Sequence, residues 1–328
     1  MSQNPIPLGL ITHNLPAHWL VSLEGQVEIL SGPTDATHLS PELEARLGYA
    51  EGLFCLLTVK VNESLLARAP RLRVVSNMAV GYDNIDVAAC TRRGIPVGNT
   101  PGVLTEATAD LTLALLLAAA RQIPLSSRDA REGRWQTWSP TGWLGMDLQG
   151  ATLGLVGMGK IGQAVATRAA AFGLRIVYHS RSDRGLPGWQ RLELDDLLAQ
   201  SDFVSLHVPL TAQTRGLINN STLRKMKPTA LLINAARGPV VDTAALLQAL
   251  QEGWIAGAAL DVTDPEPLPT EHPLYSLPNC LIVPHIGSAT FRARQRMAEL
   301  ACANLLAGLR GERLPHCVNP EIYEIQDH

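Results

Sequence analysis

A glycine-rich hexapeptide near the middle of the chain constrains the fold more than any other feature. It consists of Gly157, Met158, Gly159, Lys160, Ile161 and Gly162. It follows an apolar run and opens a helical pattern over 161–172. Such a turn lets a phosphate approach the backbone and places unpaired helix N–H groups opposite it. We therefore predict a dinucleotide site here, and the competing interpretation is that the glycines only mark a tight turn.

Strand and helix patterns alternate along almost the whole chain, which is typical of parallel α/β architecture. Its 328 residues fit two domains. We predict two doubly wound parallel-sheet domains, the second of Rossmann type. Strands are expected over residues 8–12, 27–30, 54–59, 73–78, 96–98, 152–156, 175–178, 203–208, 230–234, 256–261 and 280–283. Helices are expected over 41–47, 105–121, 161–172, 194–200, 221–226, 243–252 and 291–309, whereas 124–150 shows no clear period.

Composition excludes several classes of partner. The net charge is −3 and no long basic run occurs, so we expect no nucleic-acid partner. The most apolar segment, 111–120, is too short to span a bilayer and the N-terminus lacks a signal-peptide pattern, so no membrane association is expected. The five cysteines are scattered, and eight of the nine histidines show no ligand spacing. This pattern predicts no disulfide framework, no metal site and a cytoplasmic location.

The end of the second strand after the glycine loop bears on cofactor choice. An NAD-specific site places an acidic residue there for the ribose hydroxyls. This chain has Ser180 and Arg181, and its first acid is Asp183. A small residue beside a guanidinium suits a 2′-phosphate. We predict a preference for NADPH, with NADH possible; alternatively, Arg181 is only a solvated surface arginine.

Three further polar residues follow predicted strand ends and together fit one chemistry. They are Arg237, Glu266 and His285. Ligands of open α/β sheets bind outside the carboxyl ends of the strands. Hydride transfer to a keto acid needs a cation for the carboxylate, a proton donor, and a group that orients the donor. Taken singly, each of the three also has a structural interpretation as an ion-pairing, turn or strand-capping residue.

These motifs occur in an order that resembles a known family. They occupy residues 156–162, 234–238, 260–262 with 266–267, and 284–288. The chain resembles the D-isomer-specific 2-hydroxyacid dehydrogenases over essentially its whole length. Within that family, residues 80–86, 100–105 and 178–181 look most like glyoxylate/hydroxypyruvate reductases.

The resemblance implies a domain plan and a set of roles. Residues 1–103 and 289–328 would form a substrate-binding domain, and 104–288 an inserted dinucleotide-binding domain, with the active site in the cleft. His285 would be the general acid/base, Glu266 its partner and Arg237 the substrate anchor. The substrate carboxylate would bind the backbone of Val80 and Gly81, and Val80 in place of the lysine of phosphite-oxidising relatives disfavours that reaction. Further cofactor contacts would come from Thr108, Pro209, Ala235, Asp261, His285 and Gly287.

The tryptophan-rich segment near 124–150 predicts a subunit interface. Trp135, Trp138 and Trp143 are three of six tryptophans in the chain. Aromatic side chains are common in interface cores. The resemblance implies an arm between two subunits of a homodimer, with Trp138 reaching the neighbour's cleft. Local packing against the preceding helix is the alternative.

We therefore expect an NAD(P)-dependent dehydrogenase that reduces glyoxylate, hydroxypyruvate or a similar short 2-keto acid to the D-2-hydroxy acid. Two other functions stay open at this point. One is a dehydrogenase of larger D-2-hydroxy acids, which would differ only in pocket-lining residues. The other is a nucleotide-sensing corepressor that keeps the fold and binds protein partners.

Overall fold

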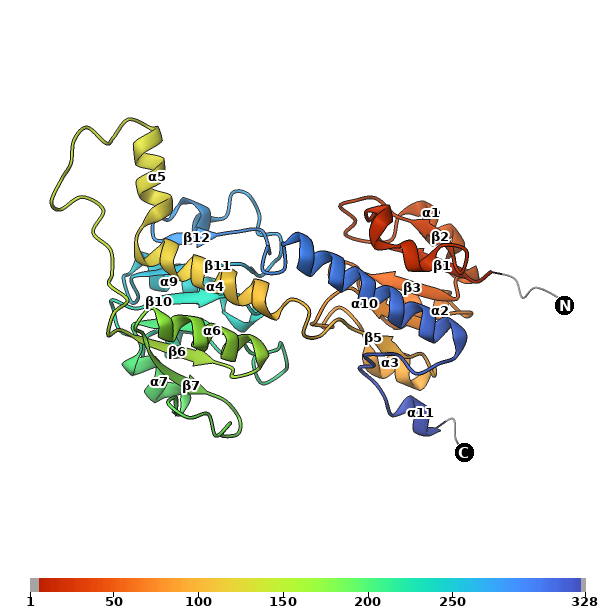
Figure 1. The fold of residues 1–328 in the computed structure, drawn as a ribbon. Coiled ribbons are helices and arrows are strands. Elements are labelled where there is room, and N and C mark those ends of the chain that lie inside the picture. The colour runs from red at the N-terminus through yellow and green to blue at the C-terminus, as the bar shows by residue number, and fades with distance from the viewer. Residues whose placement is uncertain (1–5, 326–328) are drawn as a thin grey trace. The chain divides into compact units, whose positions relative to one another are not determined.

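The structure, a computed structural model, describes residues 6–325 and divides into two compact units. The first unit comprises the chain up to Leu104 and from Thr290 onward, and the second comprises Thr105–Ala289. Each unit has one sheet in which every strand pairing is parallel (Figure 1). The parallel α/β class predicted from the alternating patterns is confirmed.

The first unit has a five-stranded sheet in the order β2-β1-β3-β4-β5. Its strands are β1 Leu8–Ile11, β2 Glu28–Ser31, β3 Gly52–Cys55, β4 Val74–Asn77 and β5 Val97–Gly98. Its α-helices are α1 Pro41–Arg46, α2 Glu63–Arg68, α3 Val87–Arg92, α10 Phe291–Arg310 and α11 Ile322–Ile325.

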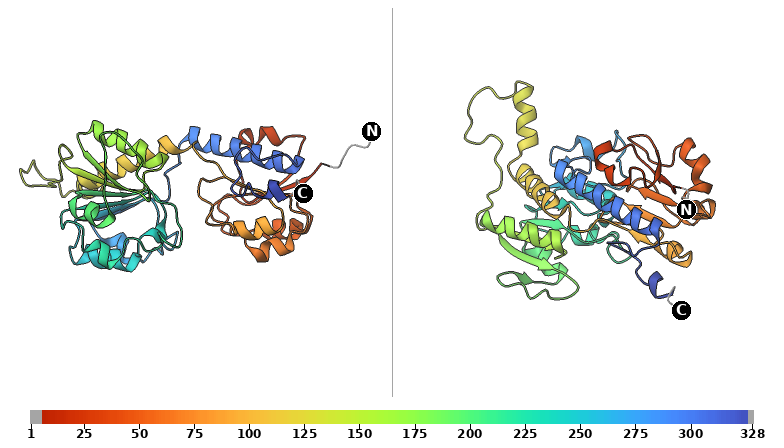
Figure 2. Two further views of the ribbon diagram at one scale, coloured as in Figure 1. Left: turned by 90° about the horizontal axis from the view of Figure 1, so that it is seen from below. Right: turned by 45° about the vertical axis from the view of Figure 1, so that its right-hand side comes forward.

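Two apolar cores cover the two faces of this sheet. Leu43 of α1, Leu66 of α2 and Ala89 of α3 belong to one core. The other face packs against α10, through Met297 and Leu305 among others. Figure 2 shows α10 on one face of this sheet and α2 and α3 on the other. Helix α10, predicted over 291–309, thus packs on the first unit.

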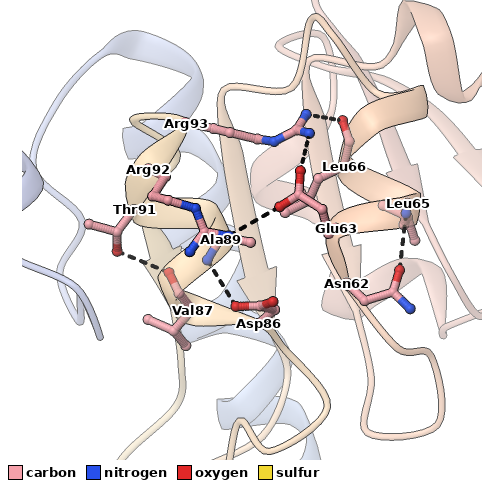
Figure 3. A network of polar contacts seen from close by, with 10 residues as sticks. All are labelled: Asn62, Glu63, Leu65, Leu66, Asp86, Val87, Ala89, Thr91, Arg92 and Arg93. Atoms are coloured by element: carbon pink, nitrogen blue, oxygen red, sulfur yellow. Dashed lines mark hydrogen bonds and ion pairs between the residues drawn. The ribbon is translucent and has the colours of Figure 1, made fainter.

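Helices α2 and α3 are joined at the surface by a polar network (Figure 3). The Glu63 carboxylate pairs with Arg92 at 3.3 Å and with Arg93 at 2.5 Å. Both helices begin with a side-chain cap: Asn62 accepts from Leu65 N–H and Asp86 accepts from Ala89 N–H. Exposed ion pairs contribute little stability, so the caps and the core beneath are the stronger determinants of these helices.

The second unit has a seven-stranded sheet in the order β12-β11-β10-β9-β6-β7-β8. Helices α4 and α6 cover one face and α7, α8 and α9 cover the other. The strand order reverses between β6 and β9, which is where ligands of such sheets bind. The strands are β6 Thr152–Val156, β7 Arg175–His179, β8 Gln190–Arg191, β9 Phe203–Leu206, β10 Leu231–Asn234, β11 Gly257–Leu260 and β12 Cys280–Ile282. The α-helices are α4 Thr105–Ala120, α5 Ile123–Arg131, α6 Lys160–Ala171, α7 Leu194–Gln200, α8 Asn220–Leu223 and α9 Thr243–Gln251.

One helix was not predicted and one strand prediction is wrong. Part of the segment 124–150, in which the sequence shows no clear period, is helix α5, none of whose residues is buried. Figure 1 shows α5 and the loop after it projecting from the body of the second unit. The strand expected over 54–59 is β3 Gly52–Cys55, because the chain turns away from the sheet after Cys55.

Helix α4 is the most apolar helix of this unit and is followed directly by α5. Among residues 6–325, no single helix has the length and apolar content to cross a membrane. Helices α4 and α5 pass that test only when taken together across a bend of 61°.

Candidate active site

The carboxyl ends of the parallel strands in the second unit bring most of the predicted residues to one edge of the sheet. Parallel strands end on the same side, so the loops that follow them are neighbours. The loops after β6, β7, β9, β10, β11 and β12 carry Gly157, Ser180, Pro209, Arg237, Asp261 and His285 respectively.

The glycine loop joins β6 to α6 next to the point where the strand order reverses. Gly157 has φ of 104°, and a Cβ there would lie 2.6 Å from the His207 carbonyl group, so the position requires glycine. At Gly159, by contrast, no atom lies within 4 Å of an added Cβ. Helix α6 begins at Lys160, so its unpaired N–H groups meet that open space. The loop fits the pyrophosphate of a dinucleotide.

The loop after β7 presents a cation rather than an acid. The Asp183 carboxylate accepts from the Tyr178 hydroxyl at 2.6 Å and from Gly185 N–H at 3.0 Å. The bond from Tyr178 is the main cause that lowers the pKa of Asp183. Ser180 is largely buried and donates its hydroxyl to the Ser182 carbonyl. The Arg181 side chain is exposed.

His285 and Glu266 are in direct contact. Nδ1 of His285 lies 2.5 Å from Oε1 of Glu266, and the side chains are 28% and 41% exposed. Thr263 N–H donates to the second carboxylate oxygen of Glu266 at 3.3 Å. The ring nitrogen Nε2 of His285 is therefore the one available for a substrate. A carboxylate on Nδ1 fixes the tautomer and the orientation of the ring.

Asp261 holds the backbone that carries His285. It is 2% exposed and accepts from Ile286 N–H at 2.6 Å and Gly287 N–H at 2.9 Å. Burial raises the pKa of Asp261, and the two backbone bonds oppose that effect. His285 itself has φ of 51°, which is uncommon for a residue with a side chain. The Thr108 hydroxyl donates to the Gly287 carbonyl and closes the loop onto α4.

The loop after β10 presents Arg237 through a side-chain turn. The Asn234 side chain accepts from Ala236 N–H at 3.1 Å and donates to the Arg237 carbonyl at 3.0 Å. At Gly238, an added Cβ would lie 1.8 Å from the Thr263 carbonyl oxygen. The loop that carries Arg237 thus packs backbone to backbone against the loop that carries Glu266. Sequence reasoning missed Asn234, although an asparagine at a strand end is a turn signal.

Three of the predicted residues lie away from this edge. Val80 and Gly81 follow β4 in the first unit and are half-buried. Trp138 is exposed on the projecting loop of the second unit, whereas Pro209 is exposed at the carboxyl edge itself.

Comparison with known proteins identifies the family. The profile of the D-isomer specific 2-hydroxyacid dehydrogenase, NAD binding domain, matches residues 113–287, more than half of the chain. The chain belongs to the D-isomer-specific 2-hydroxyacid dehydrogenase family.

Relatives of this 2-hydroxyacid dehydrogenase extend the similarity over nearly the whole chain. A glyoxylate reductase of Pyrococcus furiosus is 46% identical over 98% of this chain and 97% of its own length. A glyoxylate reductase of Thermofilum pendens is 50% identical over 87% of this chain and 86% of its own length. The structure of an NADPH-dependent glyoxylate/hydroxypyruvate reductase from Sinorhizobium meliloti, in complex with NADP and malonate, has a TM-score of 0.85 and 36% identity. It covers 96% of this chain and 97% of its own.

As a 2-hydroxyacid dehydrogenase, the chain is an NAD(P)-dependent oxidoreductase that uses a nicotinamide cofactor. The geometry of the glycine loop agrees with the binding of such a cofactor. An open approach at Gly159, the start of α6 and the reversal of strand order between β6 and β9 coincide at one place. These are the features that a dinucleotide pyrophosphate needs.

Proposed function

We propose that this 2-hydroxyacid dehydrogenase reduces glyoxylate, hydroxypyruvate or a similarly short 2-keto acid to the D-2-hydroxy acid. The observation that carries the proposal is the 2.5 Å contact between His285 and Glu266 at the carboxyl edge of a dinucleotide-binding sheet. It supplies an oriented proton donor where ligands of such sheets bind. Relatives named glyoxylate reductase, similar over almost the full length, support the substrate class.

The proposed roles follow from the contacts of each side chain. His285 donates the proton on Nε2 to the alkoxide that forms from the keto group. Glu266 orients the ring and fixes its tautomer. The Arg237 guanidinium binds the anionic substrate and withdraws charge from the keto oxygen. When bound, the nicotinamide cofactor supplies the hydride.

The substrate carboxylate is assigned to the backbone N–H groups of Val80 and Gly81 in the first unit. This gives the first unit the substrate-binding role and the second unit the cofactor-binding role. Cofactor contacts are proposed for Thr108, Gly157, Met158, Gly159, Lys160, Ile161, Gly162, Ser180, Arg181, Pro209, Ala235, Asp261, His285 and Gly287.

The preferred cofactor is proposed to be NADPH. A ribose 2′-phosphate needs a cation and the absence of a competing carboxylate. Arg181 is exposed, and the nearby Asp183 is engaged by Tyr178 and Gly185. NADH remains a usable but poorer cofactor in this proposal.

The working form is proposed to be a cytoplasmic homodimer. Trp135 and Trp138 are 62% and 80% exposed on a loop that projects from the second unit. Large exposed aromatic side chains are typical of interaction surfaces. The five free cysteines suit a reducing compartment.

A panel of 2-keto acids assayed with NADPH and with NADH tests the function. Glyoxylate and hydroxypyruvate represent the short substrates, and a branched 2-keto acid represents the larger ones. The proposal expects the highest kcat/KM for a short keto acid with NADPH. The highest kcat/KM for the branched acid, or cofactor binding without turnover of any keto acid, contradicts it.

A further inference from the structure

Three consecutive carbonyl groups of the loop after β4 are each held by a hydrogen bond. Thr100 N–H donates to the Ala79 carbonyl at 2.9 Å. The side-chain amide of Asn99 donates to the Val80 carbonyl at 2.8 Å. The side-chain amide of Asn77 donates to the Gly81 carbonyl at 2.9 Å. All three donors therefore approach the carbonyl side of the loop.

This arrangement fixes the direction of the N–H groups. A trans peptide group is planar, and its C=O and N–H point in opposite directions. The three held carbonyls share peptide groups with the N–H groups of Val80, Gly81 and Tyr82. Within the part of the chain that the structure describes, no acceptor is recorded for these N–H groups. Successive unpaired N–H groups in a turn bind anions.

The asparagine amides also strengthen these donors. A hydrogen bond to a carbonyl polarises the peptide group and makes its N–H a better donor. Asn99 acts in this way on the N–H of Gly81, and Asn77 acts on that of Tyr82. Both side chains are neutral, so they polarise the peptide groups without adding a charge beside the bound anion.

The position of Asn99 is itself fixed by helix α10. The Asn304 side chain donates to the Asn99 carbonyl at 2.9 Å and accepts from His316 N–H at 3.0 Å. A Cβ added at Gly98 would lie 2.7 Å from the Asn304 side chain, so β5 and α10 are in close contact there. Asn77 is fully buried and its carbonyl oxygen accepts from the Cys55 thiol. The side chain of Asn77 and the backbone of Asn99 are therefore both held in place beside the loop.

We propose that Asn99 and Asn77 are positioning residues that hold the N–H groups of residues 80–82 ready for the substrate carboxylate. The inference rests on the proposed function and deepens it, since it names the side chains that make the first unit selective for 2-keto acids over uncharged carbonyl compounds. Neither side chain touches the substrate; both act through the peptide groups of the loop.

Substitution of Asn99, which is only half-buried, tests the inference. Asn99→Leu removes the amide donor at similar size, and Asn99→Asp also places a negative charge beside the loop. We expect KM for glyoxylate to rise about tenfold in Asn99→Leu and further in Asn99→Asp. The inhibition constant of oxalate, a carboxylate without a reducible keto group, should rise in parallel. KM for NADPH and kcat should stay within about threefold, because the hydride and proton donors are untouched.

Two comparisons separate this role from a general loss of structure. Asn62→Ala removes the cap of α2 in the same unit without touching the loop, and its KM for glyoxylate should equal that of the wild type. Asn99→Ser, a smaller change, is the substitute if the larger variants do not fold. The inference is overturned if KM for glyoxylate and the oxalate constant are unchanged in folded Asn99 variants, or if Asn62→Ala raises KM equally. A wild type that reduces no keto acid overturns the proposed function instead.

Discussion

Two carboxylates act on His285 in different ways. Glu266, 41% exposed, contacts the imidazole ring and so bears on its charge. Asp261, 2% exposed, accepts from the two N–H groups that follow His285 in the chain and so bears on its backbone. Substitution can separate these effects. Loss of Glu266 would change proton transfer by His285, whereas loss of Asp261 would change the position of the His285 ring.

His285→Ala should lower kcat/KM for glyoxylate by about 10²–10⁴-fold, since the proton donor is lost. Glu266→Gln should retain more activity and mainly change the pH profile. The reason is that the amide keeps a hydrogen-bond acceptor beside Nδ1 of His285 but removes the negative charge. Profiles of kcat/KM against pH check both. Glu271→Gln, at an exposed acid a few positions after Glu266 in the sequence, is the control. Near-wild-type turnover by folded His285→Ala contradicts the mechanism.

The second prediction at the residue scale concerns Arg181 and the preference for NADPH over NADH. Arg181→Ala should lower kcat/KM with NADPH about tenfold and leave the value with NADH nearly unchanged. A charge-assisted hydrogen bond contributes about 1.5–3 kcal/mol, and solvent exposure reduces that contribution. Steady-state assays with both cofactors measure the ratio. Arg46→Ala, an exposed arginine of the first unit, should leave it unchanged. A wild type that favours NADH shows that Arg181 is only a surface arginine.

At the scale of elements, apolar runs in the sequence predict the buried strands. They do not predict an exposed helix, and they give wrong bounds where an apolar run continues beyond the end of a strand. Strand β6 is fully buried and its predicted bounds are confirmed. Helix α5 has no buried residue and is polar on average, so no buried apolar run marks it. After Cys55, Leu56 and Val59 continue an apolar run, but Val59 is buried from a loop rather than from the sheet. Tertiary contacts, and not local pattern, end that strand.

In the candidate site, too, some features can be predicted from local sequence and others depend on tertiary contacts. Motifs predict which residues follow the strands, because a short glycine loop or a polar residue after an apolar run is a local signal. The bonds from Ile286 and Gly287 to Asp261 span about 25 residues of sequence. The support of the Val80 carbonyl by Asn99 depends on α10, far along the chain. Such contacts depend on topology, so sequence patterns do not reveal them.

The projecting segment formed by α5 and the loop after it leads to a third prediction. Trp143 bonds to Asp129 within the segment, whereas Trp138 is 80% exposed. The wild type should be a dimer by light scattering. In the proposed dimer Trp138 reaches the neighbour's substrate site, so Trp138→Ala should raise activity on a branched 2-keto acid relative to glyoxylate. Tyr49→Ala, an exposed aromatic of the first unit, is the control. A stable monomer, or an unchanged substrate ratio in Trp138→Ala, contradicts this role.

At the scale of the whole molecule, the two units differ in how the chain builds them. The second unit is one continuous segment, Thr105–Ala289, whereas the first needs both ends of the chain. Helix α10 supplies one face of the first unit's core, so that core is incomplete until the last part of the chain is in place. The second unit contains its whole core within one segment and can be probed by its own buried groups.

His207 is partly buried with a fully buried Nδ1 atom, and it makes the stability of the second unit depend on pH. Its Nε2 lies 2.9 Å from the Ser205 hydroxyl, and its buried Nδ1 has no hydrogen-bond partner within residues 6–325. Burial lowers the pKa of His207 from 6.5 to about 4. Between these values the unfolded chain binds a proton that the folded chain does not bind. The free energy of unfolding therefore falls as pH decreases from 6.5 to 4, by up to about 3 kcal/mol from this residue.

Urea unfolding of the wild type and His207→Asn at pH 7.5, 5.5 and 4.5 measures this contribution. The variant loses packing and should be less stable than the wild type at pH 7.5. Because asparagine does not titrate, the difference between the two proteins should narrow steadily toward pH 4.5. Carboxylates that titrate in the same range are common to both proteins and cancel in the difference. His38→Asn, at an exposed position, should keep a constant difference. A pH-independent difference for His207→Asn would show that the His207 ring does not resist protonation in the folded state.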